Sequence, residues 1–144
     1  MTYLDTNVIV AWVIEGHPHH DLSYLAIADL PAEEPLAVAL HGLAELFATL
    51  TKPTGAFDLG SGQARMVVNN VRRACTVVAA TEQIYARAIG LCDDLMIGGP
   101  VVYDALHLAS AEACGADRLL TLNDSGFVRF RESTSVDLRL LRAR

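Results

Sequence analysis

YLDTNVIV, residues 3–10, begins with two apolar side chains, continues with a polar triplet and ends in a second apolar run. We interpret this stretch as a short buried strand that leads at once into a turn and a helix. Asp5 would then stand at the carboxyl end of the first strand. Open parallel α/β sheets bind their ligands at that edge, so Asp5 is the first candidate for a functional residue.

Short apolar runs of strand length recur along the chain, at residues 36–40, 75–79, 119–122 and 136–140. The segments between them carry apolar residues at the i, i+3, i+4, i+7 spacing of amphipathic helices, as in Leu43, Leu46, Phe47 and Leu50. Further helices are expected over residues 18–30, from residue 64 to 71, from 84 to 95, and over 103–114, where Gly115 would end the helix. This alternation predicts an α/β fold with a mostly parallel sheet covered on both faces.

The composition is that of one compact domain spanning residues 1–144, because 144 residues with 52% hydrophobic content suffice for one core. The chain has no apolar run long enough for a membrane span, and its start lacks the basic flank of a secretory signal. We therefore expect a cytoplasmic protein. Cys75, Cys92 and Cys114 are an odd number and lie far apart, which indicates buried side chains and neither a disulfide framework nor a structural zinc site.

The net charge of −6 weakens attraction to any polyanion and disfavours a general nucleic-acid-coating role. It does not exclude a nucleic-acid substrate, because bound cations would cancel part of the charge locally. Basic residues that could hold flanking phosphates are Lys52, Arg65, Arg72 and Arg73. Most of these side chains are expected to be solvated surface cations.

Three further acids occupy positions comparable to that of Asp5. Asp124 follows the last-but-one strand, Asp104 lies in the first turn of its helix, and Glu45 lies near the start of the helix after residues 36–40. The fold can bring all four carboxylates to one edge of the sheet. Such a cluster is costly unless a cation neutralises it, and oxygen ligands favour Mg²⁺ or Mn²⁺.

Each acid also has an ordinary structural explanation. The triplet at residues 5–7 could form a polar turn or a helix cap. Glu45 points away from the apolar stripe of its helix, where solvated charges usually lie. Asp104 could be a favourable charge near a helix N-terminus, and Asp124 a turn acid. The combination of the four carries more weight than any one of them.

The order and spacing of three segments resemble a known family over essentially the whole chain. YLDTNVIVAWV (3–13), HGLAELFATLTK (41–52) and VVYDALHLASAEACGADRLLTLNDSGF (101–127) resemble the strand with its Asp, the Glu segment and the late Asp segment of PIN-domain ribonucleases. The small size and the stretch His17-Pro18-His19-His20 are similar to the VapC toxins of type II toxin–antitoxin pairs. The resemblance implies a PIN-like three-layer α/β/α sandwich.

Carried over residue by residue, the resemblance makes Asp5, Glu45 and Asp104 the metal-binding and catalytic acids. It implies Mg²⁺, with Mn²⁺ as an alternative, in either one or two positions. The polar neighbours with supporting roles are Thr6, Asn7, Thr121 and Asn123. Thr6 or Asn7 would support the first acid, and Thr121 would orient the last.

The fourth acid departs from the family pattern. Asn123 stands where the family often has Asp, and Gly126 stands where many members carry an acid before Phe127. We expect Asp124 to replace the missing acid as a catalytic and metal-binding residue, with Asn123 as a neutral hydrogen-bonding group. If Asp124 does not replace the missing acid, the second metal position would be weakened.

The function implied is that of a Mg²⁺-dependent endoribonuclease toxin. It would hydrolyse RNA phosphodiester bonds through a metal-activated water, inhibit translation or growth, bind a VapB-like antitoxin and form a homodimer. The alternative within the family is a catalytically weakened module that binds RNA or a partner.

A phosphatase or phosphotransfer domain is a rival from another class, because its early strand also ends in Asp. Such enzymes generally have a second Asp two residues later, where this chain has Asn7, and a late Lys that is missing here. His17, His19 and His20 are interpreted as surface polarity. His107, one helical turn from Asp104, is interpreted as a satisfied histidine in the core or near the site.

Overall fold

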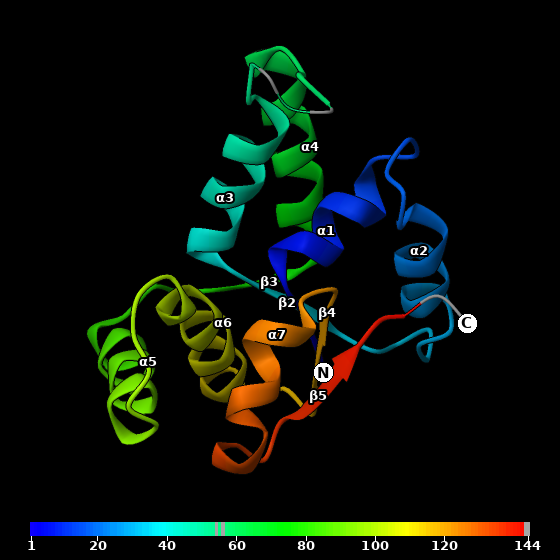
Figure 1. Cartoon of the computed structure of the whole chain (residues 1–144). Helices are drawn as coiled ribbons and strands as arrows, with labels where there is room; N and C mark the ends of the chain where they lie inside the picture. The colour runs from blue at the N-terminus through cyan, green and yellow to red at the C-terminus, as the bar shows by residue number, and fades with distance from the viewer. Residues whose placement is uncertain (54, 56, 143–144) are drawn as a thin grey trace.

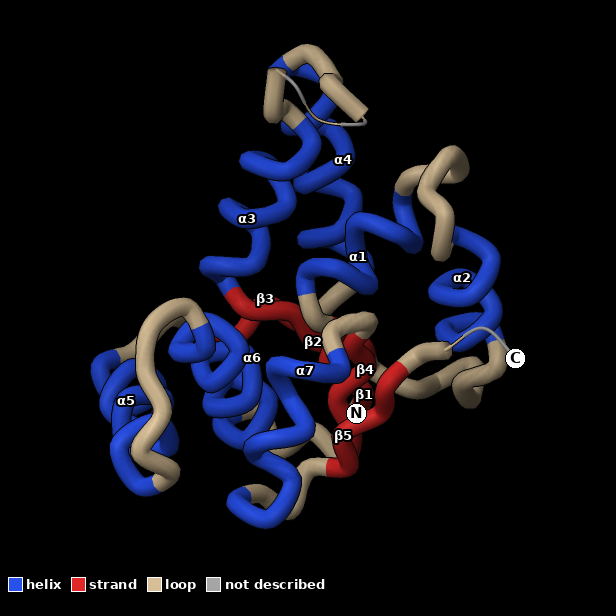
Figure 2. The backbone as a smooth tube through the Cα atoms, viewed as in Figure 1, coloured by secondary structure: helices blue, strands red, loops and turns tan. Residues whose placement is uncertain are grey.

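The computed structural model describes residues 1–53, 55 and 57–142, and places a five-stranded sheet at the centre of the molecule (Figures 1 and 2). Its strands are β1 (Thr2–Leu4), β2 (Leu36–Ala39), β3 (Thr76–Val78), β4 (Arg118–Thr121) and β5 (Asp137–Leu140). They pair in the order β3-β2-β1-β4-β5, and every pair is parallel. The predicted α/β class with a mostly parallel sheet is confirmed.

Helices cover both faces of the sheet, which gives three layers (Figure 1). One face carries α1 (Thr6–Val13), α2 (His20–Ala28), α3 (Leu40–Leu50) and α4 (Ser61–Ala74). The other carries α5 (Glu82–Asp94), α6 (Val101–Ala113), α7 (Asp124–Phe127) and the 3-10 helix η1 (Val128–Ser133). Among the described residues, no helix has the length and apolar character needed to cross a membrane.

The two cores are separated by the alternation of side chains along the strands. Tyr3 and Leu119 point into the core shared with α5 and α6, whereas Leu4 and Leu120 point into the core shared with α1, α3 and α4. All four side chains are almost completely buried. This period of two is what a sheet covered on both faces requires.

The direction of the strand order reverses between β1 and β4, which lie side by side in the middle of the sheet. The backbone N–H of Asp5 donates to the carbonyl of Leu120 (3.1 Å), so the ends of β1 and β4 are held together. Ligand sites of open α/β sheets lie at such a reversal, beyond the carboxyl ends of the strands. The fold therefore brings Asp5 and the segment after Thr121 to one place.

The elements differ from the predicted ones mainly at their ends. The helix expected over 18–30 begins at His20 and ends at Ala28, and α3 begins directly at Leu40. Gly115 has a φ of 68°, as expected for the residue that ends α6. Neither α7 nor η1 was predicted, because both are too short for an apolar period to show. The cysteines are free, with Cys75 and Cys92 buried.

Candidate active site at the carboxyl end of the sheet

Asp5 is held in a fixed position at the end of β1. Its side chain is buried, and Thr121 Oγ1, at the end of the adjacent β4, donates a hydrogen bond to Asp5 Oδ2 (2.6 Å). Asn7 joins the same network, because its Oδ1 accepts from the backbone N–H of Leu122 (3.0 Å). Thr121 was expected to orient the last acid of the chain, whereas its hydroxyl contacts the first. Parallel pairing of β1 with β4 accounts for this.

Glu45 reaches the same region from the second turn of α3. Thr6 Oγ1 donates to Glu45 Oε2 (2.6 Å), and His107 Nε2 lies 3.0 Å from the same oxygen. The close approach depends on Gly42, where an added Cβ would lie 3.2 Å from Thr6 Oγ1 and 3.4 Å from His107 Cε1. Gly42 therefore allows α3 to lie close to Thr6 of α1 and His107 of α6.

Asp104 enters from the first turn of α6. Asn123 Nδ2 donates to Asp104 Oδ1 (3.1 Å), and an added Cβ on Gly126 would lie only 2.3 Å from Asp104 Oδ2. Burial raises the pKa of Asp104, and the negative charge of Asp5 raises it further. The two aspartates are therefore close enough for their charges to interact.

These three acids face one pocket of about 650 Å³. The residues that line it are Asp5, Thr6, Asn7, Val10, His17, His19, Glu45, Thr49, Phe57, Tyr103, Asp104, His107, Leu122 and Asn123. The predicted meeting of Asp5, Glu45 and Asp104 at one sheet edge is thus present in the structure. Lys52, Arg65, Arg72 and Arg73 are exposed and do not line this pocket.

His107 lies among the three carboxylates and is almost completely buried. Burial lowers its pKa, but the hydrogen bond to Glu45 and the charges of Asp5, Glu45 and Asp104 outweigh burial, so the pKa is raised. Burial would raise the pKa of Glu45, yet the hydrogen bonds from His107 and Thr6 lower it to about 2. The surrounding negative charge therefore favours the protonated form of His107.

The donor set fits a small divalent cation. Asp5, Glu45 and Asp104 offer carboxylate oxygens, the ligands that Mg²⁺ and Mn²⁺ prefer. The carboxylates of Asp5, Glu45 and Asp104 raise the pKa of His107, so they favour a positive charge beside them. A divalent cation would compensate these acids more fully than a single proton.

The structure does not bring Asp124 into this group. Its carboxylate pairs with Arg142, and its side chain is half exposed and outside the pocket lining. Asn123 caps α7, since its Oδ1 accepts from the N–H of Gly126 (3.2 Å). Asp124 is consequently the first residue of α7 and lies on its outer side. Asn123 occupies the place beside Asp104, as a neutral hydrogen-bonding group.

Three histidines near the site were underrated or missed by the sequence analysis. His17 and His19 line the pocket, and the ring of His17 stacks on Phe57 with centroids 5.5 Å apart. His41 was not singled out, although it lies four residues before Glu45 and therefore on the same face of α3. That i, i+4 spacing is the signal that could have identified it.

Solved structures with the same fold include components of toxin–antitoxin pairs. VapBC2 from Rickettsia felis, bound to a DNA fragment from its promoter, aligns with a TM-score of 0.72 and 23% identity over 99% of this chain and 100% of that chain. VapC20 from Mycobacterium tuberculosis, a toxin that cleaves the sarcin–ricin loop, aligns with a TM-score of 0.71 and 16% identity over 89% and 94%. VapBC-1 from nontypeable Haemophilus influenzae aligns with a TM-score of 0.70 and 19% identity over 98% of both chains.

Comparison with curated protein sequences gives no match. A family model, that of the PIN domain, matches residues 2–133. This range contains strands β1 to β4 and the three acids Asp5, Glu45 and Asp104, whereas β5 lies outside it. The sequence match and the fold agree, and we conclude that the chain belongs to the PIN domain family.

Proposed function

We propose that this protein is a Mg²⁺-dependent endoribonuclease that acts as the toxin of a toxin–antitoxin pair. The observation that carries the proposal is the convergence of Asp5, Glu45 and Asp104 on one pocket at the strand-order reversal of a PIN domain. The three acids come from the residue after β1, from α3 and from α6, which the fold must bring together. A purely structural role would not require three carboxylates to line one pocket.

The surrounding residues have definite tasks in this proposal. Thr121 fixes the Asp5 carboxylate, and Thr6 with His107 fixes that of Glu45. Mg²⁺, when bound, would lower the pKa of water and stabilise charge on the phosphodiester. Asp5, Glu45 and Asp104 would hold it, and Asn123 would keep Asp104 in place. No side chain needs to act as a covalent nucleophile, and the pocket of about 650 Å³ has room for a nucleotide.

The fold comparison supports an antitoxin as the partner of this chain. Several solved structures with this fold are complexes from toxin–antitoxin pairs. We expect this chain to form a homodimer and to bind a small VapB-like protein encoded beside it. Co-expression of the two reading frames should yield a stable complex in which RNA cleavage is inhibited.

The direct test is RNA cleavage with and without Mg²⁺. Wild type should cleave in Mg²⁺ and not in EDTA, and Asp5→Asn and Asp104→Asn should lower the rate by on the order of 100-fold or more, because metal stabilisation is worth several kcal/mol. Asp93→Asn is the matched control, because Asp93 is exposed on α5 outside the pocket. Equal rates for all proteins with and without Mg²⁺ would show that this nuclease assignment is wrong.

A second candidate function is a PIN-fold binding module with little catalytic activity. It is favoured by Asn123 and Gly126, where an acid is common in the family. The carboxylate of Asp104 lies so close to Gly126 that a longer side chain at 126 would displace it. RNA binding without cleavage in Mg²⁺, together with antitoxin binding, would support this alternative.

A further inference from the structure

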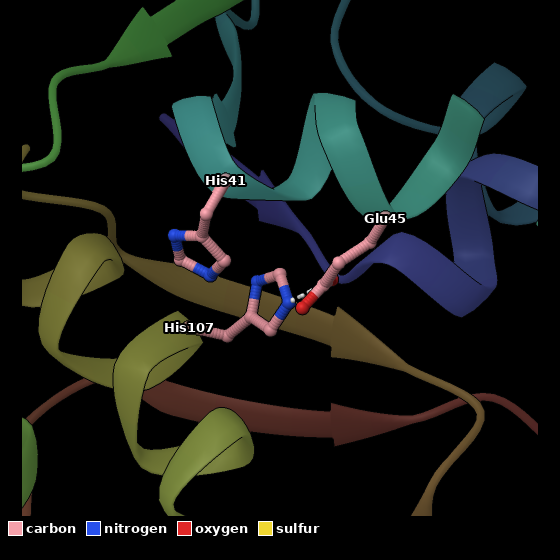
Figure 3. Close-up of side chains that lie close together, drawn as sticks. All are labelled: His41, Glu45 and His107. Carbon is pink, nitrogen blue, oxygen red and sulfur yellow. Dashed lines mark hydrogen bonds and ion pairs between the residues drawn. The ribbon is translucent and has the colours of Figure 1, made fainter. Parts of the chain in front are cut away.

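His41, Glu45 and His107 form a second group of ligand atoms beside the three acids. Figure 3 shows the two side chains of α3, His41 and Glu45, directed toward His107 of α6. One nitrogen or oxygen from each residue can be chosen such that all three atoms lie within 4.8 Å of one another. Glu45 thus belongs both to the acids described above and to a pair of imidazoles.

His41 has an unusual environment for a histidine. Its Nε2 is buried, and within the described part of the chain it has no hydrogen-bond partner. The ring centre lies 4.7 Å from that of His107, with the two planes inclined at 53°. Burial, followed by the charge on His107, lowers the pKa of His41 to about 4, so the neutral ring can present a lone pair. A buried nitrogen without a partner is costly, and a bound cation would supply one.

His107 has the support that metal-binding histidines usually have. Its Nδ1 lies 2.9 Å from the hydroxyl oxygen of Tyr3, which is completely buried. A histidine that binds a metal through one nitrogen typically donates its other N–H to an oxygen. In the tautomer whose Nδ1–H donates to the Tyr3 hydroxyl, Nε2 carries the lone pair that a metal requires, on the side that faces Glu45.

We propose that His41, Glu45 and His107 bind a zinc ion at a site distinct from that of Mg²⁺ but sharing Glu45. Two imidazoles and one carboxylate suit Zn²⁺, whereas Mg²⁺ prefers oxygen ligands alone. Tetrahedral Zn²⁺ with bonds of about 2.1 Å needs its ligand atoms roughly 3.4 Å apart. The ligand atoms now lie within 4.8 Å of one another, so zinc binding would draw them closer together by at most roughly 1.4 Å.

Zinc bound here would inhibit the nuclease. Glu45 cannot serve both cations at full strength, and zinc at His107 Nε2 would replace the present contact of that nitrogen with Glu45 Oε2 (3.0 Å). Zn²⁺ at this site would therefore compete with Mg²⁺ for the pocket acids. This inhibitory consequence rests on the proposed ribonuclease function, but zinc binding itself does not.

The binding test uses the whole protein after its metals have been removed. Zn²⁺ affinity is measured by competition with a chromophoric chelator. In a separate measurement, Co²⁺ replaces Zn²⁺ as a spectroscopic probe. Wild type should bind one Zn²⁺ and give the intense visible absorption of tetrahedral Co²⁺. His41→Ala and His41→Gln should each weaken Zn²⁺ binding at least tenfold and reduce that absorption. Two variants of different size guard against a folding defect in one, which circular dichroism would detect.

The matched control is His19→Ala, which removes an imidazole from the pocket rim and leaves His41 unchanged. Zinc affinity equal to that of wild type in His19→Ala supports the proposal. Loss of zinc binding in His19→Ala but not in the His41 variants would place the ion at the rim and overturn it. Absence of zinc binding by wild type at micromolar Zn²⁺ would also overturn it.

The second arm separates this proposal from the ribonuclease assignment. We would measure the Zn²⁺ concentration that halves Mg²⁺-dependent RNA cleavage. This concentration should be at least tenfold higher for His41→Gln than for wild type. Zinc binding without any RNA cleavage would support the zinc site and contradict the proposed function. RNA cleavage that is insensitive to zinc, together with no zinc binding, would contradict the zinc site alone.

Discussion

The hydroxyl of Thr121 donates a 2.6 Å hydrogen bond to Asp5 Oδ2 across the adjacent ends of β4 and β1. Both side chains are buried, so the carboxylate has little access to water as an alternative donor. A hydrogen bond to a charged group contributes about 1.5–3 kcal/mol. This bond therefore serves both the stability of the sheet edge and the position of the first acid.

Thr121→Val should lower the free energy of unfolding by about 1–3 kcal/mol, because Asp5 loses its donor while the volume is retained. The cleavage rate in Mg²⁺ should fall by roughly 10- to 100-fold, as for other groups that orient metal ligands. Urea unfolding and the RNA assay measure the two effects. Thr76→Val, at an exposed position of the edge strand β3, is the control and should change stability by less than about 0.5 kcal/mol.

Gly126→Ala tests the close contact with Asp104. A Cβ there would lie 2.3 Å from Asp104 Oδ2 and 2.5 Å from Asn123 Nδ2, so the Asp104 side chain must move. We expect a loss of about 1–3 kcal/mol in stability and at least a tenfold fall in cleavage. Gly90→Ala, inside α5 with nothing within 4 Å, should instead add roughly 0.5–1 kcal/mol. Equal behaviour of the two variants would contradict the described position of Asp104.

The raised pKa of His107 predicts a pH-dependent contribution to stability in metal-free buffer. The folded protein holds this proton more tightly than the unfolded chain, because Asp5, Glu45 and Asp104 surround the ring. The contribution is complete below about pH 6.5, the pKa of the free side chain, and is lost as the pH rises through the raised value. The stability difference between wild type and His107→Gln should therefore shrink from acid to alkaline pH in urea titrations.

His41 should show the opposite sign. Burial, with the charge of His107, lowers its pKa to about 4, so the unfolded chain binds a proton that the folded protein does not. Protonation of His41 in the unfolded chain should therefore lower the free energy of unfolding of wild type as the pH falls from about 6.5 toward 4. His41→Gln should be less sensitive to acid over this interval. A variant that tracked wild type throughout would show that His41 is not buried as described.

Tyr103 offers a test of the proposed RNA binding. Its ring is 60% exposed and lines the pocket beside Asp104. An unpaired base stacked on it would contribute about 1–3 kcal/mol, so Tyr103→Ala should weaken binding of single-stranded RNA about tenfold. Fluorescence anisotropy in EDTA measures binding without cleavage. Tyr85→Ala, at an exposed position of α5 outside the pocket, should leave RNA affinity as it is.

The sheet and the convergence of three acids could be predicted because they depend on patterns along the chain. Parallel strands place their carboxyl ends together, so the location of Asp5 could be predicted from the sequence. Asp104 was placed by its position in the first turn of a helix and by the resemblance to PIN domains. Glu45 was harder, because its position opposite the apolar stripe is also typical of a solvated charge. Its contacts with Thr6 and His107 depend on how helices pack.

The fourth position could not be decided from the sequence. Whether Asn123 or Asp124 faces the pocket depends on the residue at which α7 begins, and a one-residue change reverses the answer. The cap formed by Asn123 on Gly126 fixes that start. In the same way, the environment of His41 depends on the approach of α3 to α6, which no local pattern encodes.

The location of β1 between β2 and β4 has a consequence for synthesis on the ribosome. Residues 1–53 already contain Asp5 and Glu45, but Asp104 and Thr121 follow much later in the chain. The contacts that complete the pocket are thus among the most distant in sequence, and such contacts form late. The pocket of a nascent chain would therefore stay incomplete until Asp104 and β4 have left the exit tunnel.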